Sequence, residues 1–69
     1  MKLSARNVLP GKVVSIKKGP VSSLVVIEIA PGVKITSNVT SSAVTDLKLK
    51  KGTTAYAVIK SSSVMLGVD

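Results

Sequence analysis

The sequence lacks cysteine, histidine, tryptophan and phenylalanine, and Tyr56 is its only aromatic residue. Without cysteine or histidine it cannot form a zinc site of the usual ligand types, a disulfide framework or a thiol nucleophile. Its only acids are Glu28, Asp46 and Asp69, a set too sparse to favour a paired-carboxylate site or a hard-cation cage. No histidine is present to transfer protons near neutral pH. We therefore predict a protein that is not an enzyme and holds no metal cation.

Long apolar runs are also missing. The longest apolar stretch, Leu24–Ala30, contains Glu28, and no segment approaches the roughly 20 apolar residues of a membrane-spanning helix. The opening residues MKLSARNVLPGK do not have the apolar run of a signal peptide. We therefore expect a cytoplasmic protein without a membrane partner.

The size of the chain points to assembly. Its 69 residues suffice for one domain, but cores built from about 70 residues rarely stabilise a fold without a further element. Disulfides are excluded, and 45% of the residues are hydrophobic. A monomer would leave much of this apolar surface in water, so we expect an obligate homo-oligomer whose subunits share apolar faces.

The charge raises the question of nucleic acid. Ten lysine and arginine residues against three acids give a net charge of +7, which suits a phosphate-rich partner. Small β-barrels that bind single strands stack the bases on aromatic side chains, and here only Tyr56 is aromatic. We expect nucleic acid not to be the main partner, although binding through charge alone remains open.

Valine, isoleucine and threonine make up 22 of the 69 residues, a composition typical of strands. Turn signals separate the strand-like segments: Pro10-Gly11, Gly19-Pro20 and Pro31-Gly32. The predicted strands are residues 2–8, 12–17, 22–30, 33–39 and 54–60, with a short last strand at 64–68. We expect the third and fourth strands to form a hairpin.

One segment, Thr40–Leu47, departs from the strand pattern. Hydroxyl residues that can cap a helix open it, and Ala43, Val44 and Leu47 follow at helical spacing. We predict a short helix there, followed by a basic loop, KLKKG, at the favourable end of its dipole. The order of elements predicts an all-β fold, a small five-stranded OB-like barrel with one short helix, in a single domain spanning residues 1–69.

Hydrogen-bond donors gather in four places along this chain. These are Ser4–Asn7, Lys60–Ser63, the hydroxyl-rich segment Thr36–Ser42, and Lys17–Ser23. A tetrahedral oxyanion needs such donors because each of its oxygens accepts several hydrogen bonds. Each cluster also has a purely structural explanation. Ser4–Asn7 could be a solvated edge strand and Lys60–Ser63 a polar loop, while Thr36–Ser42 could cap a helix and Lys17–Ser23 could form a solvated turn. The donors alone fit phosphate or sulfate as well as other oxyanions.

Several motifs occur in a recognisable order. They are Ser4–Asn7 (SARN), Gly11–Val14 (GKVV), Ile16–Gly19 (IKKG), Lys34–Ser37 (KITS), Ala57–Ser61 (AVIKS) and Val64-Met65. Together they resemble the molbindin family, small cytoplasmic molybdate-binding proteins built on the Mop, or TOBE-like, domain. The resemblance covers essentially the whole chain, and the pair of SARN near the start and Ile-Lys-Ser near the end is its most specific part.

The resemblance implies an OB-like barrel and a hexamer arranged as a trimer of dimers. It implies that molybdate or tungstate is held at subunit interfaces for intracellular molybdenum storage and homeostasis. The oxyanion-binding residues that it implies are Ser4, Ala5, Arg6, Asn7, Thr40, Lys60 and Ser61. Ser4–Asn7 of one subunit, donating partly through backbone N–H groups, would meet Thr40 and Lys60-Ser61 of a neighbour. Some relatives have serine where this chain has Ala43, so that contact would be absent.

A second, symmetry-axis oxyanion site is implied by the resemblance at Lys18, Gly19, Pro20, Val21 and Ser22. Pro20 stands where a small aliphatic residue with a backbone N–H is expected, so the site is altered here if relatives use that N–H. Two other functions remain open beside oxyanion binding. One is a stand-alone regulatory or interaction domain with weak anion binding, and the other is a small basic nucleic-acid-binding protein.

Overall fold

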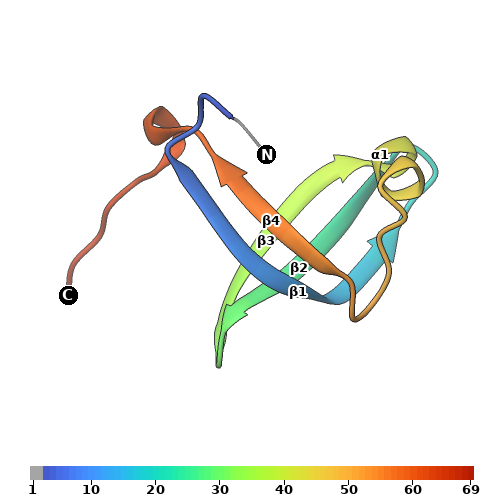
Figure 1. The fold of residues 1–69 in the computed structure, drawn as a ribbon, viewed down its shortest axis with the longest axis horizontal. Coiled ribbons are helices and arrows are strands. Elements are labelled where there is room, and N and C mark those ends of the chain that lie inside the picture. The colour runs from blue at the N-terminus through green and yellow to red at the C-terminus, as the bar shows by residue number, and fades with distance from the viewer. Residues whose placement is uncertain (1–2) are drawn as a thin grey trace.

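The computed structural model describes residues 3–69, which contain four strands, one short α-helix and one turn of 3-10 helix. In chain order these are β1 (Asn7–Lys18), β2 (Ser22–Ala30), β3 (Val33–Thr40), α1 (Ser41–Asp46), β4 (Thr54–Ile59) and η1 (Ser61–Ser63). The strands form one antiparallel sheet in the order β3-β2-β1-β4, which curls into a half-barrel (Figure 1). The all-β, OB-like prediction is confirmed, but with four strands in place of five.

The strand count differs because Pro10-Gly11 does not end a strand. The two predicted strands 2–8 and 12–17 are largely one element, β1, which runs through both residues; residues 3–6 precede it without regular structure, and Lys2 lies outside the described residues. A Cβ on Gly11 would lie 2.7 Å from the Glu28 carbonyl oxygen. This glycine therefore allows two strands to approach closely, which is a different use of glycine from a turn.

β1 is long because it has two partners. Its first half, Asn7–Lys12, pairs with β4, and its second half, from Lys12 onward, pairs with β2. Pro10 lies where only the β4 side of β1 is paired, so a residue without an N–H is tolerated. The register shifts between Val13 and Ser15, and such a bulge bends the strand and helps the sheet to curl.

The β2–β3 hairpin forms as predicted around Pro31-Gly32. Gly32 has φ +76°, a conformation that glycine adopts without steric cost. Along β2, alternate residues Ser23, Val25 and Ile27 are buried, the pattern of a strand with one face toward a core.

The predicted helix is confirmed with its cap. The Thr40 side chain accepts a hydrogen bond from the Ala43 backbone N–H at 3.1 Å, which satisfies one of the unpaired donors of the first turn. Val44 is buried against the sheet, whereas Leu47, expected on the same face, is largely exposed.

The core is small and lies on the concave face of the sheet. It consists of Val13, Val25, Ile27 and Val44. The predicted last strand at 64–68 does not form: these residues are exposed and continue past η1 as an extended tail that leads away from the sheet (Figure 1). Among residues 3–69, no helix combines the length and the apolar character needed to cross a membrane.

Candidate functional site

The start of β1 and the end of β4 bring two of the predicted donor clusters together. Asn7 pairs with Ile59 in the sheet, and the Asn7 side-chain Nδ2 donates to the Ile59 carbonyl oxygen at 3.3 Å. Lys60 follows as the first flanking residue of η1, with Ser61 next. Ser4–Asn7 and Lys60-Ser61 therefore lie at the same end of the sheet in one chain.

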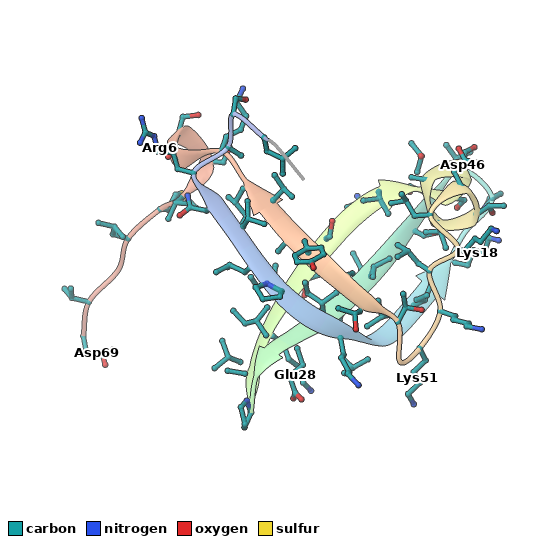
Figure 2. All side chains as sticks on the ribbon, viewed as in Figure 1. Arg6, Lys18, Glu28, Asp46, Lys51 and Asp69 are labelled. Carbon is teal, nitrogen blue, oxygen red and sulfur yellow. The ribbon has the colours of Figure 1, made fainter. Side chains whose placement is uncertain are left out.

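This end, here called the anion end and comprising Ser4–Asn7 and Lys60–Ser63, is rich in free donors. Arg6 and Lys60 are exposed, and Arg6 lies at the same end of the molecule as η1 (Figure 2). The three acids, Glu28, Asp46 and Asp69, lie elsewhere in the molecule (Figure 2). Two cations and several hydroxyl groups without a nearby carboxylate form a surface that favours an anion.

Thr40, the remaining residue of the predicted site, lies at the opposite end of the sheet. It pairs with Ser22 at the end of β3, and its hydroxyl oxygen already caps α1. One chain therefore brings together six of the seven predicted residues and leaves Thr40 apart. The family resemblance implies that Lys60-Ser61 comes to Ser4–Asn7 from a neighbouring subunit, whereas in this structure the two segments lie together within one chain.

The residues of the predicted second site surround the turn between β1 and β2. A shallow pocket of about 280 Å³ lies there, and its polar lining includes Lys18, Gly19 and Ser22. The Lys18 Nζ donates to Thr45 Oγ1 of α1 at 3.4 Å. Pro20 and Val21 lie at the exposed tip of the turn and are not part of the pocket lining.

Two buried serines, Ser23 and Ser41, hold this turn in place; the sequence places each in a donor cluster but does not predict that they bond to each other. Ser41 Oγ donates to the Gly19 carbonyl oxygen at 2.6 Å and lies 2.7 Å from Ser23 Oγ. Because Ser41 has one hydroxyl hydrogen and uses it on Gly19, Ser23 donates to Ser41. No buried side-chain nitrogen or oxygen in the described part of the chain lacks a partner.

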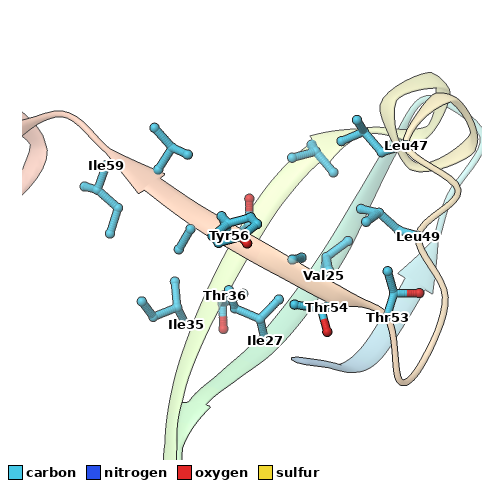
Figure 3. Close-up of a pocket in the computed structure, with 15 residues that line it drawn as sticks. Val25, Ile27, Ile35, Thr36, Leu47, Leu49, Thr53, Thr54, Tyr56 and Ile59 are labelled. Atoms are coloured by element: carbon cyan, nitrogen blue, oxygen red, sulfur yellow. The ribbon is translucent and has the colours of Figure 1, made fainter. Parts of the chain in front are cut away.

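An apolar hollow lies on the concave face between β3 and β4 (Figure 3). This groove, here called the edge groove, has a volume of about 520 Å³ and includes Ile35, Val39, Leu49 and Tyr56 in its lining. Such a lining suits apolar side chains and not a small dianion. Within residues 3–69 there is no group of three or more metal-binding acid, histidine or cysteine side chains.

Comparison with known proteins decides the family. The model of the TOBE domain matches residues 3–66. The chain belongs to the TOBE-domain family. The domain shares 52% identity over 69 residues with a probable molybdenum-pterin-binding protein of Haemophilus influenzae, and the match covers all of both chains.

Solved structures place this TOBE domain in the molbindin, or Mop, group. MopII from Clostridium pasteurianum superposes with a TM-score of 0.90 at 49% identity, covering 97% of this chain and all of that one. The cytoplasmic molybdate-binding protein ModG, in a form with molybdate bound, gives a TM-score of 0.93 at 49% identity. That match covers all of this chain and 49% of ModG. The resemblance read from the motifs is confirmed.

Proposed function

We propose that this protein binds molybdate or tungstate at subunit interfaces and serves intracellular molybdenum storage and homeostasis, without catalysing a reaction. The observation that carries the proposal is the pairing of Asn7 with Ile59, which gathers Ser4–Asn7 and Lys60-Ser61 at one end of the sheet. The relatives named above, described as molybdenum-pterin-binding and molybdate-binding proteins, support the choice of ligand.

The anion end has the chemistry that such a ligand requires. A tetrahedral dianion presents four oxygens, each of which accepts more than one hydrogen bond. Lys60 supplies a mobile ammonium group, Ser61 a hydroxyl, and the irregular segment before β1 supplies backbone N–H groups. Charge-assisted bonds from lysine or arginine to an oxyanion are stronger than neutral ones. The exposed anion end would bury such an anion only when a second chain covers it.

The separation of Thr40 from the anion end favours a site shared between subunits. Within one chain the two lie at opposite ends of the sheet, so Thr40 reaches an anion held by Ser4–Asn7 only if it comes from another copy. We infer a single Mop-type domain over residues 1–69 that assembles as a hexamer, a trimer of dimers, in the cytoplasm. The turn at Lys18–Ser22 would provide a second, weaker site, with Pro20 lacking one donor.

A nucleic-acid function is less well supported by the same structure. Tyr56 is the only aromatic residue of the chain, and its side chain forms part of the lining of the edge groove. It therefore offers no row of exposed rings on which successive bases could stack.

Parallel calorimetric titrations test the proposal. The full-length protein is titrated with molybdate, tungstate, sulfate and phosphate at one pH and ionic strength. We expect molybdate and tungstate to bind at least about 100-fold more tightly than sulfate, because donors spaced for the larger anion remain unpaired around a smaller one, at roughly 1–3 kcal/mol each. Equal affinity for sulfate and molybdate would contradict the proposal.

Native mass spectrometry with and without molybdate provides the second measurement. We expect six chains and bound anions in one complex. Six chains that never retain an anion would favour the regulatory or interaction domain instead. Retention of the protein on nucleic acid that fades with salt, together with no anion binding, would favour the third function.

A further inference from the structure

A circuit of hydrogen bonds joins α1 to the turn between β1 and β2. The Lys18 Nζ donates to Thr45 Oγ1 at 3.4 Å, and Thr45 Oγ1 donates to the Ser41 carbonyl oxygen at 3.3 Å. Ser41 Oγ in turn donates to the carbonyl oxygen of Gly19, the residue after Lys18, at 2.6 Å. The circuit begins and ends at neighbouring residues of the turn, so α1 defines where the Lys18 ammonium group lies relative to the Gly19 backbone.

Thr45 is well suited to hold a lysine side chain. A threonine within a helix can donate its hydroxyl hydrogen to the carbonyl oxygen four residues earlier, and the bond to Ser41 has this spacing. With its hydrogen used in this way, the Thr45 hydroxyl oxygen is left as an acceptor, and Lys18 is the donor that it accepts from. The buried contact between Ser41 and Ser23 ties α1 to the sheet, so the acceptor lies on a fixed element.

Lys18 benefits from such support because its side chain is long and exposed. A lysine loses more rotamer freedom on binding a ligand than most side chains do, and a contact that already restricts it reduces that loss. The ammonium group has three N–H donors. One donor used on Thr45 leaves two for a ligand, so the bond restrains Lys18 without using it up.

The pocket at this turn depends on Lys18 because the backbone there has few free donors. Pro20 has no N–H, and the Gly19 N–H donates to the Ser22 carbonyl oxygen at 3.1 Å. The charged residues that line the pocket are both lysines. Asp46, the acid of α1, lies at the same end of the molecule as Lys18 (Figure 2) but is not part of the lining. The pocket therefore favours an anion, and a side chain must supply the donor that proline lacks.

We propose that Thr45 is a positioning residue of the second oxyanion site at Lys18–Ser22. It holds the Lys18 ammonium group beside the turn, and Lys18 replaces the donor that Pro20 cannot supply. This inference rests on the proposed function and concerns only the weaker of its two sites. The ligand is a tetrahedral oxyanion, and molybdate is the probe. If Thr45 instead withheld Lys18 from the anion, its removal would change the affinity in the opposite direction.

Three variants of α1 test this role. Thr45→Val removes the acceptor and keeps a branched side chain of similar size, Thr45→Ser restores the hydroxyl, and Ser42→Ala removes an exposed hydroxyl of the same helix that lies outside the circuit. Calorimetric titration of the full-length protein with molybdate resolves a tighter and a weaker class of site. We expect Thr45→Val to raise the Kd of the weaker class about three- to tenfold and to leave the tighter class unchanged. Thr45→Ser and Ser42→Ala should stay within about twofold of the parent.

Lys18→Ala identifies which class belongs to this turn. We expect this variant to lose the weaker class and to keep the tighter class, which is assigned to the anion end. If Lys18→Ala keeps both classes, or if the parent has only one, no second site depends on Lys18 and the inference is overturned. A parent that binds no molybdate at all would contradict the proposed function itself, and this inference with it.

Sedimentation velocity and urea unfolding check that the effect of Thr45 is not a structural one. Because Thr45 is exposed, we expect Thr45→Val to assemble and unfold like the parent. Three results would overturn the inference: unchanged or tighter molybdate binding by Thr45→Val, an equal loss of binding in Ser42→Ala, or a loss that Thr45→Ser does not restore.

Discussion

At the α1 end of the sheet two serine side chains are buried and bonded to each other, whereas the serines of the anion end are exposed. Ser23 and Ser41 are 2% and 8% exposed and form a continuous hydrogen-bonded chain to the Gly19 carbonyl oxygen. At the other end, Ser61–Ser63 are all exposed, and no side chain caps η1. The buried pair at one end is satisfied within the chain, and the exposed donors at the other end are open to water, a ligand or another chain.

Replacing one hydroxyl at each end tests this comparison most strongly. We expect Ser41→Ala to lower the free energy of unfolding by about 2–4 kcal/mol, because it leaves the Gly19 carbonyl and the Ser23 hydroxyl without a partner, at roughly 1–3 kcal/mol each. Ser62→Ala, at the exposed end, should change it by less than about 0.5 kcal/mol. Urea unfolding at one fixed chain concentration measures both. Similar losses at the two ends would contradict the comparison.

Substitutions at the anion end should change the affinity for molybdate, although they hardly change the free energy of unfolding. We expect Lys60→Ala to weaken molybdate binding by about 1.5–3 kcal/mol, the range for hydrogen bonds to charged groups. Lys51→Ala, an exposed lysine in the turn before β4, is the control for a change in net charge and should bind like the parent. If Lys60→Ala remains oligomeric and binds molybdate normally, the proposed position of the site is wrong.

Arg6 shares the anion end with Lys60 but is expected to act differently. It belongs to the Ser4–Asn7 segment, whose backbone N–H groups are the proposed ligands, so its guanidinium is better suited to bridging subunits. We expect Arg6→Ala to reduce molybdate binding by about 1 kcal/mol or less and to weaken assembly more than Lys60→Ala does. Calorimetry and sedimentation on the two variants decide this, and the reverse order of effects would exchange the two roles.

The smallest expected effect on stability concerns backbone strain at Lys48, near the α1 end of the sheet. Lys48 follows α1 with φ 53°, a left-handed conformation that favours glycine. We expect Lys48→Gly to stabilise the fold by about 0.5–1 kcal/mol and to leave molybdate binding unchanged. A loss of stability in urea unfolding would show that the lysine side chain makes a compensating contact.

The elements that the sequence predicts correctly are those determined by local chemistry. Thr40 caps a helix that begins at the next residue, and Pro31-Gly32 turns a hairpin, because capping and positive φ act over a few residues. Pro10-Gly11 has the same local signature but a different cause. Gly11 is required by the Glu28 carbonyl, a contact that depends on the fold and that no nearby residue reveals.

The candidate site shows the same difference between what local sequence reveals and what only the fold determines. The donor clusters are visible in the sequence, and the molbindin motifs join them into one proposal. Their positions depend on the sheet. Asn7 lies beside Ile59 because β1 pairs with β4, and Thr40 lies far from the anion end because of the order of the strands. The strand predicted at 64–68 does not form, because a strand needs a neighbouring strand and periodicity alone does not provide one.

The pairing of β1 with β4 also sets the order in which the protein can be made. Asn7 meets a residue fifty-two positions later in the chain, so it must wait until β4 has left the ribosome. The pairing of β1 with β2 and of β2 with β3 needs no residue of β4, since both pairings lie within residues 12–40. The anion end therefore exists only once β4 has paired with β1. Any ligand of that end is captured only by chains in which β4 has already paired with β1.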